Sequence, residues 1–415
     1  MLRKKINLND NSDKWDISKD KIHKTLWLSA TTLRESELSM MQFDQIIDRK
    51  ATYALKWEKY KGRDILPMWI ADTEFKCAPA ILEALKARVD HGLLGYTLPA
   101  HDQGANQAVV DWLSRQYGWQ IEKDWIVWTP GVVPAFNIVC KAYCQAGDKV
   151  MVQTPNYPPL LAAPKLHGLQ RVDIPTVEVN KRWTLDFVEL EKQAADPACR
   201  LFIICNPMNP VGSVLSPDEM QRIASICNKN DVLLCSDEIH CDLILDEQAR
   251  HIPVGKVSSL TESSITLMAA SKTFNVAGLG TSFAIIPNRQ LRQRFSAAAQ
   301  GIVPWVNVLG QVATEAAFSN CDEWHQAELN YLRANRDYLV EQINSIDGLR
   351  LLTPQATFLA WIDASGLGVD NPQGYFESKG IGPSPGIDFG DKNFVRINFG
   401  CPRSHLEEMI GLLKA

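Results

Sequence analysis

Residues 200–240 read RLFIICNPMNPVGSVLSPDEMQRIASICNKNDVLLCSDEIH, and this stretch decides the fold class. Two short apolar runs, Arg200–Cys205 and Asp231–Ser236, have the length of buried strands and are followed by polar turn residues. Between them, residues 216–229 begin with Ser-Pro-Asp-Glu, a capping box that predicts the start of a helix. A strand, a helix and a second strand in this order predict one unit of a parallel sheet.

The same alternation of apolar runs and helical patterns continues on both sides of this stretch. Seven strands are predicted in total, at Trp125–Trp128, Lys149–Gln153, Arg171–Ile174, Arg200–Cys205, Asp231–Ser236, Ser264–Met268 and Ser282–Ile286. The pattern indicates an α/β large domain whose mostly parallel seven-stranded sheet carries helices on both faces. Ligands of such sheets bind beyond the carboxyl ends of the strands, so polar motifs are sought there.

A smaller α+β domain is predicted after the sheet. A long helical pattern runs over residues 312–347, followed by short strands at Phe358–Ile362 and Asn393–Ile397 and a final helix from Ser404.

Residues 41–85 precede the sheet and are expected to pack with this smaller domain. We therefore predict a small domain made of residues 41–85 and 320–415, and a large domain of residues 86–319. Residues 1–40 are polar and charge-dense, which predicts a loosely ordered extension. An ordered arm that wraps a partner subunit is the alternative for this segment.

The composition is that of an ordinary globular protein. Hydrophobic residues make up 46% of the 415 positions, and the net charge of −5 gives no reason to expect nucleic-acid or membrane-surface binding. We see no apolar run of the ~18 residues that a membrane span needs, and no secretory signal. The ten cysteines are scattered and complete no metal-site spacing, so we expect buried thiols in a reducing cytoplasm and no metal.

The sharpest motif surrounds Lys272, in the run Ala270-Ser271-Lys272-Thr273-Phe274-Asn275-Val276-Ala277-Gly278. A lysine just past a strand end, flanked by small residues, is suited to Schiff-base chemistry because a desolvated amine loses its proton readily. The alternative is a surface lysine.

Two further motifs follow predicted strands. Asp237 lies in Ser-Asp-Glu-Ile-His (residues 236–240), where a carboxylate can keep a ring nitrogen protonated. Asn209 belongs to the second of two Asn-Pro steps, which force a non-helical path and can present its amide to a ligand oxygen. A helix-capping Asp and a simple turn are the alternatives.

Three more motifs complete the set. Residues 129–135 (Thr-Pro-Gly-Val-Val-Pro-Ala) lead from a strand into a helix, whose N-terminal N–H groups form an anion site. Tyr157 ends Thr-Pro-Asn-Tyr past another strand. Arg396, in Val-Arg-Ile-Asn of the second domain, suits a carboxylate, although an exposed strand charge is the more frequent case. Five of the six motifs lie at strand ends on one edge of the predicted sheet.

In this order and spacing, the motifs resemble those of fold-type I (aspartate aminotransferase-like) pyridoxal-phosphate (PLP) enzymes. More narrowly, the chain resembles the bacterial cystathionine β-lyase-like C–S lyases. The resemblance spans about residues 41–415 and rests on seven motifs: Leu-Pro-Met-Trp-Ile-Ala-Asp (66–72), Gly-Tyr-Thr (95–97), Pro-Gly-Val-Val (130–133), Asn-Pro-Val-Gly (209–212), Ser-Asp-Glu-Ile-His (236–240), Ser-Lys-Thr-Phe-Asn (271–275) and Val-Arg-Ile-Asn (395–398).

The resemblance implies the PLP-dependent transferase-like fold and a role for each matching residue. Lys272 forms the Schiff base and later moves the substrate Cα proton, and Arg396 binds the substrate carboxylate on a side that Trp69 and Ala71 also line. The other implied cofactor contacts are Asp237 at the pyridine nitrogen, Asn209 at the phenolate oxygen, Tyr157 stacked on the ring, His240 beside it, and Ser271 with the backbone of Val132 and Val133 at the phosphate. Tyr96 reaches the phosphate of a neighbouring subunit, which implies a homodimer.

Two positions point to the reaction. Many aminotransferases of this fold carry Arg where this chain has Gly280, and Tyr where it has His240; both departures match the C–S lyase branch. The resemblance thus implies cleavage of cystathionine or related cysteine S-conjugates to a thiol, pyruvate and ammonia. The usual Ala-Asp-Met-Asp-Phe is here Ala-Asp-Thr-Glu-Phe (71–75), so the particular thioether stays open.

Two alternatives remain at this stage. An amino-acid aminotransferase would share Lys272, Asp237, Asn209 and Arg396. A PLP-binding regulatory protein that acts through a protein partner is the alternative from another class. Trp305 and Asn307 are further candidate lining residues, although core packing explains such a tryptophan equally well.

Overall fold

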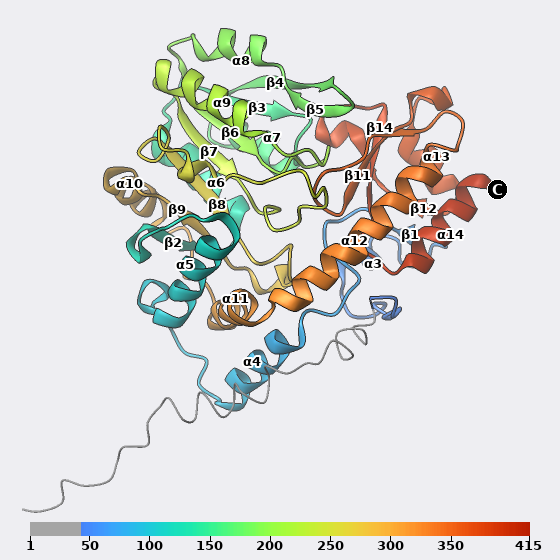
Figure 1. Ribbon diagram of the computed structural model, residues 1–415, viewed down its shortest axis with the longest axis horizontal. Helices are drawn as coiled ribbons and strands as arrows, with labels where there is room; N and C mark the ends of the chain where they lie inside the picture. Colours follow the sequence, from blue (N-terminus) through green and yellow to red (C-terminus); the bar gives the residue numbers. More distant parts are fainter. Residues whose placement is uncertain (1–42) are drawn as a thin grey trace, which may run out of the picture. The chain divides into compact units, whose positions relative to one another are not determined.

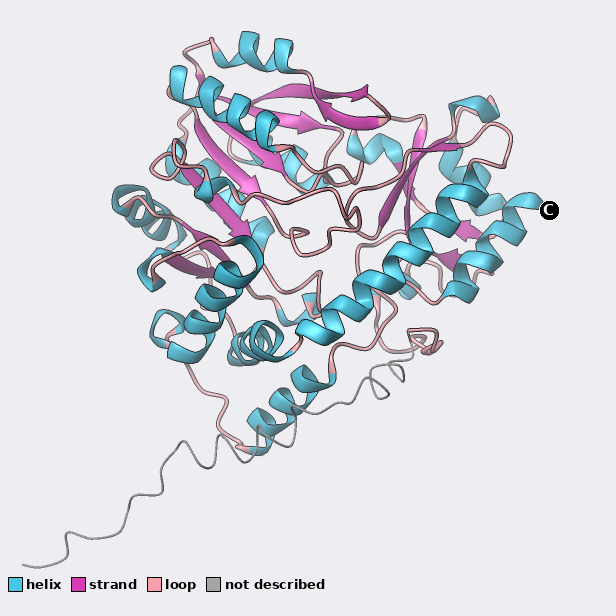
Figure 2. Ribbon diagram, in the orientation of Figure 1, coloured by secondary structure: helices cyan, strands magenta, loops and turns pink. Residues whose placement is uncertain are grey.

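The computed structural model describes residues 43–415, which form one compact unit. The extension predicted for residues 1–40 lies outside the described residues. Figure 1 follows the chain through its elements, and Figure 2 separates the strands from the helices around them.

The α-helices are α3 (Leu55–Glu58), α4 (Pro79–Asp90), α5 (Gln103–Tyr117), α6 (Val132–Tyr143), α7 (Pro158–Leu166), α8 (Phe187–Ala194), α9 (Pro217–Lys229), α10 (Arg289–Ala299), α11 (Val308–Asn320), α12 (Asp322–Ile343), α13 (Pro372–Ser378) and α14 (Arg403–Lys414). The strands are β1 (Leu66–Pro67), β2 (Ile126–Thr129), β3 (Lys149–Thr154), β4 (Gln170–Val179), β5 (Arg182–Leu185), β6 (Cys199–Cys205), β7 (Leu233–Asp237), β8 (Ser264–Met268), β9 (Ser282–Ile285), β10 (Arg350–Leu351), β11 (Leu359–Asp363), β12 (Ile381–Gly382), β13 (Ser384–Pro385) and β14 (Phe394–Asn398).

The large sheet confirms the α/β fold class but has eight strands, not seven. Its order is β2-β9-β8-β7-β6-β3-β4-β5, and the central pairs from β8 to β4 are parallel. Each of the seven predicted strands corresponds to one of these. The missed strand, β5, pairs antiparallel with β4 across Asn180 and Lys181, whose φ angles are 52° and 60°. Two left-handed residues make a tight hairpin turn of the I′ type, which Asn-Lys signals less clearly than Asn-Gly does.

The sheet is covered on both faces because its central strands are apolar throughout. In β6, Leu201, Ile203 and Cys205 pack toward a core that includes α6, α7 and α10 residues, whereas Phe202 and Ile204 pack toward residues of α8 and α9. Successive side chains of a strand point to opposite faces, so an uninterrupted apolar run requires a layer of helices on each side. Figure 1 shows α8 and α9 together over one of these faces.

The predicted capping box of α9 is present. The Ser216 hydroxyl accepts a hydrogen bond from the Glu219 amide at 3.2 Å, and the Glu219 carboxylate accepts one from the Ser216 amide at 2.7 Å. Arg182 of β5 forms an ion pair with the same carboxylate at 2.7 Å, so the cap also holds the β5 hairpin against α9.

We expect Ser216→Ala to lower the free energy of unfolding by about 1 kcal/mol, because one N-terminal amide of α9 loses its acceptor. Urea unfolding followed by circular dichroism measures this difference. Ser365→Ala, at an exposed position outside any such cap, is the control. An unchanged urea midpoint in Ser216→Ala would contradict the assignment of the cap as a stabilising element.

The C-terminal part contains a second, four-stranded sheet in the order β10-β11-β14-β13. Residues before the large sheet pair with this part of the chain: β1 and β12 form a separate parallel two-stranded sheet, with Leu66 opposite Ile381. The long helical pattern predicted for residues 312–347 is two helices, α11 and α12, separated at Cys321, whose φ of −118° is not helical. The two acidic residues of the first α12 turn suit a helix start there. The domain boundaries at residues 85 and 320 stay a prediction.

Candidate active site

The polar motifs gather beyond the carboxyl ends of the large sheet. Asn206 follows β6, Asp237 ends β7, Lys272 lies four residues after β8, and Tyr157 lies three residues after β3. These strands are neighbours in the sheet, in the order β8, β7, β6 and β3. The edge therefore brings together side chains that lie up to 115 residues apart in the sequence.

Lys272 lies against the segment that follows β1. Its amine donates a hydrogen bond to the Ala71 carbonyl at 2.6 Å. Burial lowers the pKa of this amine to about 8, against the opposing charge of Asp72. An amine with a pKa near 8 has an appreciable neutral fraction at physiological pH, and this fraction can act as a nucleophile toward a carbonyl carbon and as a base.

Asp237 is a buried carboxylate with few partners. It is 2% exposed, and the described part of the chain gives its side chain one hydrogen bond, from the Ile239 amide at 3.2 Å. Burial raises the pKa of this carboxyl to about 7, which the nearby Lys272 opposes. A cationic ring nitrogen beside it would restore the charged form, as the pairing with a pyridinium requires.

Arg396 of β14 is a buried cation. It is 4% exposed, and within residues 43–415 no carboxylate forms an ion pair with it. Its guanidinium donates to the Asn209 side-chain oxygen at 3.0 Å and to the Trp69 carbonyl at 2.7 Å, while its Nε has no partner. Burial lowers the pKa of Arg396 to about 10. A desolvated guanidinium without a counter-ion fits a site for an anionic ligand group.

The contact with Arg396 also orients Asn209. Because the Asn209 carbonyl oxygen accepts from the guanidinium, its NH₂ group is the part of the amide that remains to donate. This orientation fits the predicted bond from Asn209 to a phenolate oxygen. The peptide bonds before Pro207 and Pro210 on this loop are cis.

Tyr157 and His240 lie close enough to Arg396 for its charge to act on both. Burial raises the pKa of the Tyr157 hydroxyl, an effect that the charge of Arg396 opposes and that of Asp237 reinforces. Burial lowers the pKa of His240 to about 3, so its ring is neutral, and its Nδ1 has no partner among the described residues. The unpaired nitrogen of this buried ring indicates that a further polar group belongs beside it.

The predicted phosphate site lies at the start of α6. Val132 and Val133 are its first two residues, and no side chain caps the helix. Gly131 precedes them with a φ of 156°, which L-residues rarely adopt. Ser271 is buried next to Lys272. Free N–H groups at the start of a 12-residue helix are of the kind that binds a phosphate, and the part of the Ser271 hydroxyl in this site stays a prediction.

The remaining candidates occupy other surroundings. Tyr96 is 96% exposed and its ring meets that of Trp305, which is 61% exposed and is therefore not a core residue. The Asn307 side chain caps α11 and donates to the Leu279 carbonyl. Trp69 contributes its backbone carbonyl to the site, whereas its indole donates to the Lys56 carbonyl at 3.0 Å and lies against Lys59. A side-chain role of Trp69 toward substrate stays a prediction.

Several residues of the site had no role assigned from sequence. Asn275 donates to the Thr73 and Phe75 carbonyls, and Asn398 donates to the Ile70 and Asp72 carbonyls. Both asparagines end motifs that sequence reasoning had found, so their amides were available as candidates.

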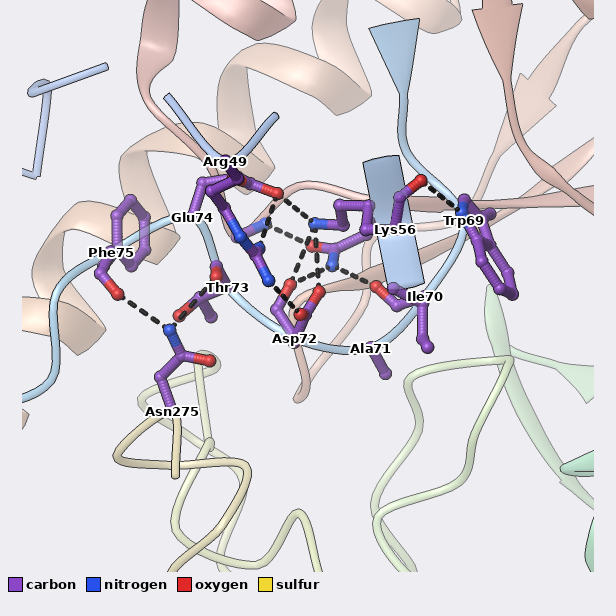
Figure 3. A network of polar contacts seen from close by, with 12 residues as sticks. Arg49, Lys56, Trp69, Ile70, Ala71, Asp72, Thr73, Glu74, Phe75 and Asn275 are labelled. Atoms are coloured by element: carbon purple, nitrogen blue, oxygen red, sulfur yellow. Dashed lines mark hydrogen bonds and ion pairs between the residues drawn. The ribbon is translucent and has the colours of Figure 1, made fainter. Parts of the chain in front are cut away.

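Arg49 and Lys56 were missed as well. They form ion pairs with Asp72 and Glu74 around the same segment (Figure 3). No local pattern in their surroundings in the sequence distinguishes them from surface charges.

Comparisons with known proteins agree over nearly the whole described chain. The model of a family described as aminotransferase class I and II matches residues 67–413. The Bacillus subtilis protein named cystathionine beta-lyase PatB is 34% identical over 90% of this chain and 99% of its own length. The crystal structure of OvoB has 45% identity and a TM-score of 0.87, over 89% of this chain and 97% of that one. The PLP-bound C-S lyase from Staphylococcus hominis has 32% identity and a TM-score of 0.82, over 90% and 97%.

Proposed function

The chain belongs to the aminotransferase class I and II family, and we propose that it is a PLP-dependent carbon–sulfur β-lyase that cleaves cystathionine or a related cysteine S-conjugate. One observation carries the substrate class: the buried Arg396, which has no carboxylate partner among residues 43–415, lies within the electrostatic reach of Tyr157 and His240. The lyase relatives, which cover nearly the full chain, support the reaction.

The residues present fit the cofactor. Lys272 supplies the amine, Asp237 a buried carboxylate for the ring nitrogen, Asn209 a free NH₂ group, and the start of α6 an anion site. When bound, PLP supplies the electron sink for carbanion chemistry.

Each residue of the site has its own role in the proposed reaction. Arg396 binds the α-carboxylate of the amino acid and fixes the direction of its Cα–H bond. With PLP bound, the Lys272 amine would be the base that takes the Cα proton at its Nζ. The negative charge of Asp237 would keep the ring nitrogen of the bound cofactor protonated. The Cβ–S bond breaks, a thiolate leaves, and water converts the remaining three-carbon fragment to pyruvate and ammonia.

Gly280 supports assignment to the C–S lyase branch, in which this position lacks the phosphate-binding arginine of many transferases. Gly280 caps the turn after Ala277 with a φ of 55° and a ψ of 58°, in the left-handed region that favours glycine. An arginine, which many transferases of this fold place there for the phosphate, would be strained in this backbone.

A homodimer with shared active sites is part of the proposal. Tyr96 is almost fully exposed, and large apolar side chains beside it in the chain or in contact with it are exposed too: Leu93, Leu94, Leu98 and Trp305. A second copy of the chain would bury this surface and bring its Tyr96 to the phosphate site. Sedimentation velocity of the full chain tests the dimer.

We also propose a cytoplasmic location, since all ten cysteines are free and most are buried. In the described part of the chain, no helix combines the length and the apolar character that crossing a membrane requires.

The experiment that tests the function supplies L-cystathionine without a keto acid and measures pyruvate and free thiol. A lyase releases both with repeated turnover. Turnover that requires an added keto acid would make the protein an aminotransferase. Absence of turnover under both conditions, together with capture of a protein partner, would favour the regulatory role.

A further inference from the structure

Four charged side chains lie around residues 70–75, the segment that accepts the hydrogen bond from Lys272. Arg49 forms ion pairs with Asp72 at 2.8 Å and with Glu74 at 3.0 Å. Lys56 of α3 forms ion pairs with the same carboxylates, at 3.3 Å and 2.8 Å. Figure 3 shows both cations on the same side of the segment, directed toward Asp72. We call these four residues the charge cluster.

Two members of the charge cluster are buried to an unusual degree for their residue types, whereas the side chains of Arg49 and Asp72 remain 23% and 24% exposed. Lys56 is 1% exposed and Glu74 is 5% exposed. Lysine and glutamate are almost never buried so completely unless they are paired, and such pairs cost solvation free energy. Two of each sign cancel in this cluster, which leaves the balance of charge sensitive to the loss of any one member.

The cluster is one residue away from the contact of Lys272. Asp72 follows Ala71, whose carbonyl accepts the hydrogen bond from the Lys272 amine at 2.6 Å. Asn398 fixes the carbonyls on both sides, that of Ile70 at 2.6 Å and that of Asp72 at 2.7 Å, and Lys56 also donates to the Asp72 carbonyl at 3.0 Å. The backbone that faces Lys272 therefore has little freedom to move relative to the Asp72 carboxylate.

We propose that Asp72 is a positioning residue for the proton transfer, and that its carboxylate, balanced against Lys56, governs how firmly the Lys272 amine holds a proton. This inference rests on the proposed function, in which the amine takes the Cα proton. Asp72 acts through Lys272 and the backbone between them, without contacting the reacting atoms.

The charges around Lys272 have opposing effects. Burial favours the neutral amine most strongly, and Asp72 is the largest single charge that favours the protonated form. Four other titratable or charged groups face the amine: Arg396 from β14, Asp237 from β7, Lys56 from α3 and His240 from the loop after β7. Arg396 and Lys56 lower the pKa of Lys272, and Asp237 raises it.

This balance suits a group that must both accept and release a proton. The pKa of Lys272 is about 8, close to the pH at which the protein works if the compartment is neutral. Without Asp72 the amine would lose its strongest electrostatic support and would be a weaker base. Without Lys56 the two carboxylates would be less neutralised, and the amine would hold its proton more firmly.

The test uses three single variants: Asp72→Asn, Lys56→Met and, as a control, Glu377→Gln. Glu377 forms an ion pair with Arg63 at 2.9 Å and thus anchors a neighbouring part of the same N-terminal segment, without being among the charges that act on Lys272. In the cofactor-free full chain, the rate of Schiff-base formation with added PLP is measured against pH. The ionisations of PLP itself are the same for every variant, so differences between the midpoints report on Lys272.

We expect the midpoint to move down by about one pH unit in Asp72→Asn, since a nearby opposite charge has this size of effect. We expect it to move up in Lys56→Met, by less, and to stay in place in Glu377→Gln. Local damage to the segment would move both cluster variants in the same direction. Shifts of the same sign, or no shift in Asp72→Asn, would overturn the inference.

In the holoenzyme, Asp72→Asn should lower kcat by up to about tenfold, because the base weakens by about one pKa unit, leave KM for L-cystathionine within about twofold, and increase the isotope effect of Cα-deuterated substrate, since proton removal becomes slower. An unchanged isotope effect with a raised KM would overturn the positioning role. A different outcome would overturn the proposed function instead. In that outcome the midpoints of the cofactor-free variants shift as expected, but the wild-type holoenzyme releases no pyruvate from L-cystathionine.

Discussion

Lys272→Ala gives a protein that forms no Schiff base with added PLP, retains no yellow colour after dialysis, and loses turnover by about 10⁴-fold or more. The substitution removes the amine that forms the Schiff base and the base that takes the Cα proton, so two steps lose their reacting group together. An absorption spectrum of the purified protein, before and after addition of PLP, measures the first effect. Pyruvate release from L-cystathionine measures the second.

Lys165→Ala is the matched control, because Lys165 is an exposed lysine in the last turn of α7. It should keep the yellow colour and the wild-type rate. A wild type that is colourless and remains so after PLP is added would show that the cofactor assignment is wrong. A coloured Lys272→Ala protein with a reducible Schiff base would assign that bond to a different lysine.

Arg396→Ala should lower kcat/KM for amino-acid substrates by about 100-fold or more and leave the cofactor colour intact. The reason is that a buried guanidinium binds a carboxylate by charge-assisted hydrogen bonds in a desolvated place, where removing one partner of such a pair costs about 2–5 kcal/mol. Most of the loss should be in KM. Arg396→Lys should recover only part of it, since an ammonium lacks the planar fork of donors.

Arg350→Ala provides the comparison for Arg396→Ala. Arg350 lies on β10 of the same small sheet and pairs with Glu178 at the surface, so its loss should leave both KM and colour unchanged. Loss of cofactor from Arg396→Ala, with normal folding, would show that this arginine holds PLP and not the substrate.

Arg396 and Arg350 show that two residues of one type can have different roles that their local sequence does not distinguish. Both lie on short strands of the second sheet, and nothing in their immediate neighbours separates a ligand-binding arginine from an exposed one. The motif around Arg396 gained meaning from its place in a series of other motifs. Its burial, and the lack of a carboxylate partner within residues 43–415, is a property of the packed structure.

The charge cluster of Arg49, Lys56, Asp72 and Glu74 is a case in which part of the feature is visible in the sequence but its structural role is not. Residues 71–75 depart from the usual motif, and the sequence alone places this departure on the substrate side. In the structure, the Glu74 carboxylate points to Arg49 and Lys56, while Thr73 is buried and its hydroxyl has no partner among the described residues. The two cations come from a segment whose sequence carries no recognisable motif.

The sequence by itself determined how strands and helices of the large domain follow one another along the chain, and which motifs lie at the strand ends. Both depend on residues close together in the chain: the apolar period, the capping box at Ser216, and the turn chemistry of Asn-Pro steps. The sequence did not predict the hairpin at Asn180 and Lys181, because its turn residues are weak signals. It also did not predict the helix break at Cys321, because the helical pattern continues on both sides of it.

Only the tertiary structure decided the state of each group at the site. The Lys272 pKa near 8, the Asp237 pKa near 7 and the neutral His240 result from burial and from charges contributed by β14, α3 and the segment after β1. Desolvation and Coulomb interactions depend on distance in space, and the residues that exert them lie as far as 216 positions from Lys272 in the sequence. No local pattern records those distances, so the chemistry could be named from the motifs while its tuning could not.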